Sequence, residues 1–278
     1  MGQYNFDQIL DRTHTKSLKY DFAVKRGKPA DVLPFWVADM DFEIPPELKQ
    51  ILLDRVKHGV FGYTESDDEY FEVLKNWFAT RFNWTPEQKW LVKTPGIVFA
   101  LAMAVRAFTE VGEGVLINQP VYYPFSMVID DNNRRLINVP LIKGDEKYTI
   151  DFEGIERAII EENVTLFLLC NPHNPVGRVW TEDELKRLGD ICIKHNVLIV
   201  SDEIHADFVW KGHTHKVFAA LGESYAEHCI VCTAPSKTFN IAGLQVSNIF
   251  IPNDSLRRRF IKEIDRAGYS QLNTMGIV

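Results

Sequence analysis

Short apolar runs alternate with longer segments of helical periodicity through the middle of the chain. The runs contain few polar positions, which is typical of strands buried on both faces of a parallel sheet that helices cover. The pattern therefore predicts an α/β fold with a predominantly parallel sheet flanked by helices. The expected strands are 115–117, 164–170, 197–200 and 229–233, with 246–251 as a further candidate.

Helices are marked by their caps and by the spacing of their apolar positions. The clearest helix follows Thr181, which forms a capping box with Glu184, and its apolar positions recur on one side up to Asn196. Together with the runs before and after it, this helix makes a strand, helix, strand unit. Other helices are expected from Pro45 or Pro46 to Gly59, from a cap at Ser66 to about Arg81, over 97–108, and over 254–267.

Composition and charge limit the classes of function. A chain of 278 residues with 46% apolar residues can bury a large core, and we expect one large domain with part of a second. The net charge of -7 gives no sign of nucleic-acid binding, and the run Arg257–Arg259 is expected on the solvated face of its helix. The polar N-terminal stretch and the short apolar runs favour a cytoplasmic protein without a membrane span.

The four cysteines fall in expected core segments, which is typical of reduced packing residues. Cys229 and Cys232 have the spacing of a redox pair, but residues three apart in a strand point to opposite faces, so we expect no disulfide. His213 and His215 lie in an expected exposed loop without a second ligand pair, so no metal site is expected.

Polar segments follow three of the expected strands at the point where each strand ends. These segments are Asn171–Gly177, Ser201–His205 and Ala234–Thr238. Because ligands of open α/β sheets bind beyond the carboxyl ends of the strands, side chains at these positions should share one crevice. A lysine in such a crevice could form an imine with a carbonyl compound once its pKa is lowered. The expected members of the crevice are Tyr122, Asn174, Asp202 and Lys237.

A second feature suits an anionic ligand. Gly96 precedes the expected buried helix 97–108, and the first amides of a helix have no partner within it. The helix dipole is positive at this end, so Gly96, Ile97 and their neighbours could hold a phosphate. The alternative is an ordinary helix start that glycine makes easier.

At this point the motifs resemble a known family. Segments 171–177, 201–205 and 236–238, in this order and spacing, resemble pyridoxal-phosphate enzymes of the aspartate aminotransferase fold, also called fold type I. The resemblance narrows to the MalY/PatB-type cystathionine β-lyase branch, and it covers the whole chain. The segments typical of that branch are Trp36–Phe42, Phe61–Thr64 and Ser236–Leu244.

The resemblance implies roles for five residues around the cofactor ring. Lys237 would hold pyridoxal 5'-phosphate through an imine and later transfer a proton. Asp202 would keep the pyridine nitrogen protonated, and Asn174 would donate a hydrogen bond to the ring hydroxyl oxygen. Tyr122 would stack on the ring and His205 would support that region, while ordinary packing is the alternative for these two aromatic residues.

The resemblance also implies a phosphate site and a partner. The phosphate would rest on the amides of Gly96 and Ile97, with hydroxyl donors from Ser236 and Thr233. In this family a tyrosine of the neighbouring subunit reaches the phosphate, and here that residue would be Tyr63. We therefore expect a homodimer with shared active sites.

Two departures from the family pattern concern phosphate binding and length. Many transaminases of this fold have serine and arginine where this chain has Ala234 and Gln245, which favours elimination over transamination. In the family the chain continues into a C-terminal lobe. We therefore expect residues 1–45 to be an N-terminal arm of the small domain, 46–278 to be the large cofactor-binding domain, and the C-terminal lobe to be absent.

The resemblance implies α,β-elimination of L-cystathionine or a related cysteine S-conjugate, with release of a thiol, pyruvate and ammonia. A class I/II aminotransferase would use the same lysine, aspartate and asparagine, and it remains an alternative. A second alternative is an inactive truncated fragment that only binds a partner or the cofactor.

Overall fold

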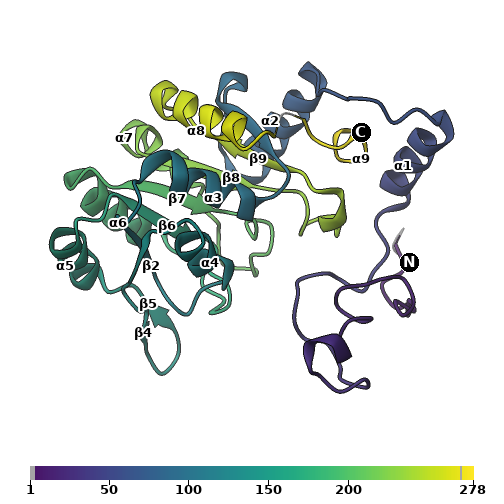
Figure 1. The fold of residues 1–278 in the computed structure, drawn as a ribbon, viewed down its shortest axis with the longest axis horizontal. Coiled ribbons are helices and arrows are strands. Elements are labelled where there is room, and N and C mark those ends of the chain that lie inside the picture. Colours follow the sequence, from purple (N-terminus) through teal and green to yellow (C-terminus); the bar gives the residue numbers. More distant parts are fainter. Residues whose placement is uncertain (1–3, 270) are drawn as a thin grey trace.

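A mixed seven-stranded sheet forms the centre of the part of the chain that the computed structural model describes, residues 4–269 and 271–278 (Figure 1). Strands β8, β7, β6, β2 and β3, which are adjacent in this order, run parallel to one another, whereas β9 is antiparallel to both β8 and β1. The predicted fold class is therefore confirmed. The order across the sheet is β1 (Leu91–Thr94), β9 (Ser247–Phe250), β8 (Cys229–Thr233), β7 (Leu198–Asp202), β6 (Leu166–Cys170), β2 (Gly114–Ile117) and β3 (Arg135–Asn138).

Helices cover both faces of this sheet, and each face has its own apolar core. One core includes the buried faces of α2 (Asp68–Phe82), α5 (Phe152–Glu162) and α6 (Glu182–Lys194). The other includes those of α3 (Ile97–Phe108), α4 (Pro124–Asp130) and α8 (Asp254–Arg266). Successive strand residues point to opposite faces, so each central strand contributes to both cores.

The remaining elements are short or lie at the periphery. They are α1 (Pro46–His58), α7 (Glu223–Glu227), α9 (Thr274–Ile277), the hairpin of β4 (Ile142–Lys143) and β5 (Tyr148–Thr149), and the 3-10 turns η1 (Val24–Arg26), η2 (Gln88–Trp90), η3 (Phe218–Leu221) and η4 (Ala242–Leu244). Among the described residues, no helix is long and apolar enough to cross a bilayer.

Most predicted helix starts agree with the structure, and one is wrong by a residue. The capping box of α6 is present, with Thr181 accepting from the Glu184 amide and Glu184 accepting from the Thr181 amide. Helix α2 is capped by Asp67, not Ser66, because the Asp67 carboxylate accepts from the amide of Tyr70 at 3.1 Å. A carboxylate and a hydroxyl are both good caps, and sequence alone does not separate neighbouring ones.

The prediction for the cysteines is confirmed. Cys229 packs in the core on the α6 side of the sheet and Cys232 in the core on the α3 side, and all four cysteines are free and buried. The three-residue spacing therefore separates the two thiols of β8 across the sheet.

The expectation that the whole arginine run is solvated is wrong at Arg257. Only 9% of Arg257 is exposed, and its guanidinium donates to the main-chain oxygen of Ile251 at 2.8 Å. The first turn of α8 packs back on the end of β9, so this arginine satisfies a carbonyl that leaves the sheet there. The next residue, Arg258, stays exposed, as expected.

Residues 4–45 form an extended arm whose one regular element is η1, and the purple segment projects from the main body in Figure 1. Helix α1 follows and has no buried residue. The arm nevertheless contacts the body, since Asn240 binds the main chain of Met40 and Phe42. The division of the chain at residue 45 stays a prediction.

Candidate active site

The carboxyl ends of the parallel strands bring the polar segments to one edge, as predicted. In the register of the sheet, Asp202 of β7 lies between Cys170 of β6 and Cys232 of β8. The segments that follow these three residues therefore leave the sheet side by side. These segments carry Asn174, His205 and Lys237.

Asp202 is a buried carboxyl group at the centre of this edge. It is 5% exposed, and its Oδ1 accepts a hydrogen bond from the amide of Ile204 at 3.1 Å. Burial raises the pKa of Asp202 to about 7, against the opposing Ile204 hydrogen bond, and the nearby charge of Glu203 raises it further. The charge of Lys237 lowers this pKa, so the two groups are within electrostatic range. A cation beside Asp202 would favour its ionised form.

Lys237 lies in a tight turn between β8 and η4. The amide of Phe239 donates to the oxygen of Pro235 at 3.0 Å, and that of Ile241 donates to the oxygen of Ser236 at 3.0 Å. The pKa of His205 is lowered, first by burial and then by the charge of Lys237. The structure therefore places Lys237 near both Asp202 and His205.

Tyr122 also belongs to this cluster. Its ring follows β2 and is 39% exposed. Its pKa is raised by burial, then by Tyr123, and then by the negative charge of Asp202. The Tyr122 phenol is therefore within electrostatic range of Asp202.

Several polar groups at this edge have no partner in the part of the chain that the structure describes. No hydrogen bond or ion pair within residues 4–269 and 271–278 involves the Lys237 amine, the Asn174 side-chain amide, the Ser236 hydroxyl or the second oxygen of Asp202. An amine, an amide, a hydroxyl and a carboxylate without partners, on neighbouring segments at one strand edge, form a suitable donor and acceptor set for a polar ring compound.

The expected phosphate site lies at the start of α3. Gly96 is the N-cap of α3, and the amides of the first helical turn have no partner in the helix. Thr233 is 7% exposed, and its hydroxyl donates to the main-chain oxygen of Asn248 at 2.8 Å. The Thr233 hydroxyl proton is therefore already used in this bond between β8 and β9, whereas the Ser236 hydroxyl has no partner among the described residues and is free to donate.

Tyr63 is the one predicted site residue that projects away from its own chain. It lies between α1 and α2 and is 96% exposed. An exposed ring in this position suits the predicted contact with a neighbouring subunit, which stays a prediction.

Sequence reasoning missed a buried charged cluster beneath Asp202. The Glu203 carboxylate accepts from Ser201 and His215 at 2.8 Å each and from the amide of Phe218 at 2.9 Å. His215 is 2% exposed, so the expectation of an exposed His215 is wrong. The signal was available, because a glutamate directly after a buried strand needs a partner and few candidates lie nearby.

His173 was also missed as a structural residue. It is 3% exposed, and its Nε2 lies 3.0 Å from the main-chain oxygen of Pro120. Burial lowers the pKa of His173 to about 4, so the neutral ring donates this hydrogen bond. His173 thereby joins the loop of Tyr122 to the loop of Asn174.

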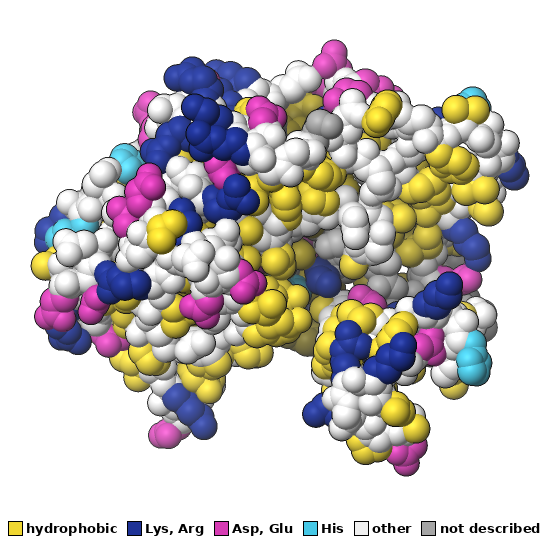
Figure 2. Space-filling view, viewed as in Figure 1, with side chains coloured by type: hydrophobic (Ala, Val, Ile, Leu, Met, Phe, Trp, Pro, Cys, Tyr) yellow, Lys and Arg dark blue, Asp and Glu magenta, His cyan; other side chains and the backbone are white. Residues whose placement is uncertain are grey.

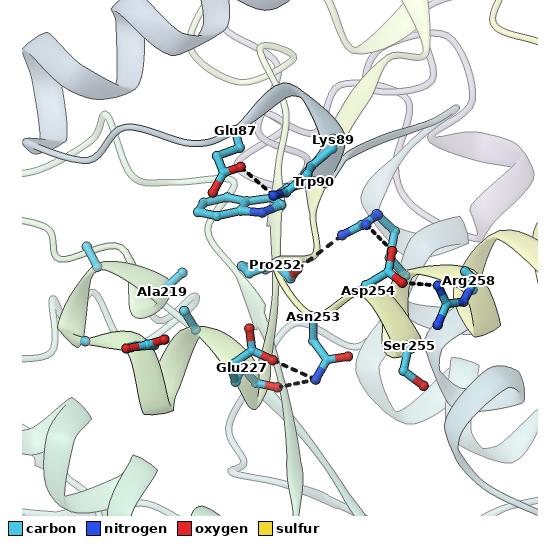
Figure 3. Close-up of a pocket in the computed structure, with 15 residues that line it drawn as sticks. Glu87, Lys89, Trp90, Ala219, Glu227, Pro252, Asn253, Asp254, Ser255 and Arg258 are labelled. Carbon is cyan, nitrogen blue, oxygen red and sulfur yellow. Dashed lines mark hydrogen bonds and ion pairs between the residues drawn. The ribbon is translucent and has the colours of Figure 1, made fainter.

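A hollow lies at the opposite edge of the sheet, and most of its charged groups are paired (Figure 3). It has a volume of about 940 Å³. The Asn253 side chain donates to the Glu227 carboxylate at 2.9 Å, and Asp254 pairs with Arg258. Because these side chains satisfy one another, the hollow is a poorer candidate than the edge at Lys237.

Comparison with known proteins gives a consistent result. The family described as aminotransferase class I and II matches residues 30–276. Cystathionine beta-lyase PatB of Bacillus subtilis strain 168 is 43% identical over 98% of this chain and 70% of that protein. Protein MalY of Escherichia coli strain K12 is 32% identical over 99% of this chain and 70% of that protein.

Solved structures agree in fold. Cystalysin from Treponema denticola, which contains a pyridoxal 5'-phosphate cofactor, superposes with a TM-score of 0.94 at 42% identity. The PLP-bound C-S lyase from Staphylococcus hominis superposes with a TM-score of 0.92 at 35% identity. Both comparisons cover 99% of this chain, and they cover 70% and 69% of the two larger chains.

Proposed function

Because the chain belongs to the class I and II aminotransferase family, we propose that it is a pyridoxal-phosphate-dependent carbon-sulfur β-lyase. Its substrate is L-cystathionine or a related cysteine S-conjugate. One observation carries this assignment: Lys237 and Asp202, both without a partner for their reactive atoms in the described part of the chain, lie at the same strand edge. The names of PatB, cystalysin and the Staphylococcus hominis C-S lyase support the choice of reaction.

The groups at this edge fit pyridoxal 5'-phosphate. Lys237 provides the amine that the cofactor aldehyde needs, and Asp202 provides a carboxylate for the pyridine nitrogen. The Asn174 amide suits the ring hydroxyl, and the Tyr122 ring can lie on the ring face with His205 nearby. We assign the phosphate to the amides of Gly96 and Ile97 and to the Ser236 hydroxyl.

The chain's own residues bind the ligand, set its charge and move a proton. When bound, the cofactor supplies an electron-poor ring that stabilises negative charge at the substrate Cα. The Asp202 carboxylate keeps a proton on the ring nitrogen, in a buried place where this charge-assisted bond is strong. Main-chain hydrogen bonds hold the turn that carries Lys237, and we assign to its Nζ the removal of the proton from the substrate Cα.

Bond changes in the substrate then follow in order. The Cα–H electron pair forms the Cα–Cβ double bond, and the Cβ–S bond breaks with its electrons on sulfur. The thiolate takes a proton, and the remaining 2-aminoacrylate hydrolyses to pyruvate and ammonia. The protein contributes position and electrostatics to these steps.

We further assign a homodimer in the cytoplasm. Exposed apolar side chains gather over α1 and the following loop (Figure 2), including Ile51, Val56, Val60 and Phe61. A patch of this kind suits a subunit interface, and it lies next to the exposed Tyr63 that we assign to the neighbouring site. Four free, buried cysteines are in keeping with a reducing compartment.

Two measurements test the assignment. The visible spectrum of the purified protein with pyridoxal phosphate should show an imine band that borohydride removes, and mass spectrometry should then find the added pyridoxyl group on Lys237. Incubation with cystathionine should release a thiol and pyruvate, and Lys237→Ala should release neither.

Other outcomes decide for the alternatives. Amino-group transfer to an added keto acid without thiol release would make the protein an aminotransferase. An imine band without any turnover of cystathionine, cysteine conjugates or amino donors would leave only a binding role.

A further inference from the structure

Two segments that are far apart in the sequence meet at Asn240, three residues after Lys237. The Asn240 Oδ1 accepts from the amide of Met40 at 3.0 Å. Its Nδ2 donates to the oxygen of Met40 and to that of Phe42, each at 3.0 Å. The side chain thus bonds both main-chain groups of one arm residue, as a neighbouring strand would, and in doing so satisfies its own amide.

The Asn240 end of this contact is fixed. Asn240 has a left-handed backbone with φ of 57°, which asparagine tolerates better than most residues. The turn that holds Lys237 is anchored on its other side, where the Thr238 hydroxyl donates to Asp207 at 2.7 Å. The ring of Phe239 packs on Trp77 with ring centres 5.5 Å apart. Asn240 therefore projects from a rigid turn.

The arm end is braced as well. Arg12 bonds Asp41 at 2.7 Å and Asp39 at 3.3 Å, and the largely buried Lys19 donates to the oxygen of Asp39 at 2.9 Å. Val37 has φ of 59°, a backbone conformation that a β-branched residue adopts only when its surroundings impose it. The residues that make the contacts described above, 39–42, come shortly after Val37 in the chain.

We infer that Asn240 is a positioning residue that locks the arm segment Trp36–Phe42 against the lysine turn, so that the arm forms a fixed wall for the amino-acid substrate. The expected effect on substrate kinetics rests on the proposed lyase function, whereas the contact between Asn240 and the arm does not depend on it. Loss of the lock would loosen substrate binding more than the chemical step, because Lys237 and Asp202 keep their own supports.

Two variants of the holoenzyme test this inference. Asn240→Gly keeps the left-handed backbone without cost and deletes all three side-chain bonds. Asn240→Asp keeps the shape and the acceptor for Met40 but places a carboxylate against two carbonyl oxygens. Asn163→Gly is the matched control, since Asn163 ends α5 with a φ of 52° far along the chain from either segment.

Hydrogen exchange followed by mass spectrometry measures how firmly the arm segment is held, and steady-state kinetics measure the effect on substrate binding. In Asn240→Gly and Asn240→Asp, peptides that span residues 36–42 should exchange about tenfold faster, as expected for the loss of one to two net hydrogen bonds. KM for cystathionine should rise about tenfold, while kcat and the imine band stay near those of the wild type. Asn163→Gly should change none of these readings.

Unchanged exchange over residues 36–42 in Asn240→Gly would overturn the lock. Faster exchange with an unchanged KM would overturn the role of the arm as a substrate wall. If the unaltered enzyme released no pyruvate, the lyase assignment would fail, and the exchange experiment would still decide the lock.

Discussion

At the scale of single residues, the site depends on a carboxyl group whose charge is set by its surroundings. Asp202 is buried, and its pKa of about 7 in the absence of a ligand lies far above its ordinary value of 3.8. A cationic ring nitrogen would reverse this effect, because an opposite charge at hydrogen-bond distance favours the ionised carboxyl group. The charge of Asp202 and the occupancy of the site are therefore linked.

This linkage predicts how the stability of the cofactor-free protein changes with pH. Because the folded-state pKa exceeds 3.8, Asp202 stabilises the fold fully below pH 3.8, and this contribution is lost as pH rises toward about 7. The free energy of unfolding should fall by up to about 1.4 kcal/mol per pH unit in this window, relative to Asp202→Asn. Urea titrations of both proteins at pH 5 and pH 7.5 measure the difference. An equal change in the free energy of unfolding between the two pH values in both proteins would contradict the prediction.

The same residue gives a catalytic prediction. Asp202→Asn should lower kcat for pyruvate release by about 10- to 100-fold, as expected from the loss of a charge-assisted hydrogen bond of about 1.5 to 3 kcal/mol. Glu227→Gln, at the opposite edge of the sheet, is the control and should keep the wild-type kcat. An Asp202→Asn enzyme with unchanged kcat would remove Asp202 from the reaction.

At the scale of elements, Asp202 is the last residue of a strand, whereas Tyr122, Asn174 and Lys237 lie in loops, and His173 joins two of these loops. His173→Ala leaves the oxygen of Pro120 without its donor in a buried place, so the free energy of unfolding should fall by about 1 to 3 kcal/mol. The affinity for pyridoxal phosphate should fall as well, because the loops of Tyr122 and Asn174 lose their connection. Urea titration at pH 7.5 and a spectroscopic cofactor titration measure the two effects.

The exposed His213 supplies the matched control for this change. His213→Ala should leave both stability and cofactor affinity unaltered, since His213 lies on the surface. Equal losses in the two variants would mean that the hydrogen bond to Pro120 has no special effect.

Sequence patterns predicted the elements better than the contacts between them. The central strands and the capping box of α6 follow from local apolar runs and from one short motif, so they were predictable. Strand β1 has two polar residues, Lys93 and Thr94, among four, and its partner β9 is 153 residues away at Thr94 and Ser247, so the local pattern gave no signal for it. The partners of Glu203 and Asn240 depend on the same kind of distant packing.

At the scale of the whole molecule, the proposed dimer gives a test that one chain alone cannot satisfy. If Tyr63 serves the neighbouring site, Tyr63→Ala and Lys237→Ala are each inactive in homodimers. Mixing the two inactive variants under conditions that exchange subunits should restore pyruvate release, because each mixed dimer contains one site with both residues. Activity that does not return on mixing, with mixed dimers verified by mass, would place Tyr63 outside the partner's site.

The position of β9 in the sheet also bears on the order in which the sheet can form during synthesis, because the last strand of the sequence pairs with the first. Strand β1, which leads directly to the Gly96 amides, has β9 as its hydrogen-bonded neighbour, and β9 ends at Phe250. A nascent chain that has left the ribosome only as far as β8 therefore contains the strand that precedes Lys237 but lacks the strand that pairs with β1. The complete sheet, with β1 in its place beside the start of α3, therefore forms only after β9 has been made.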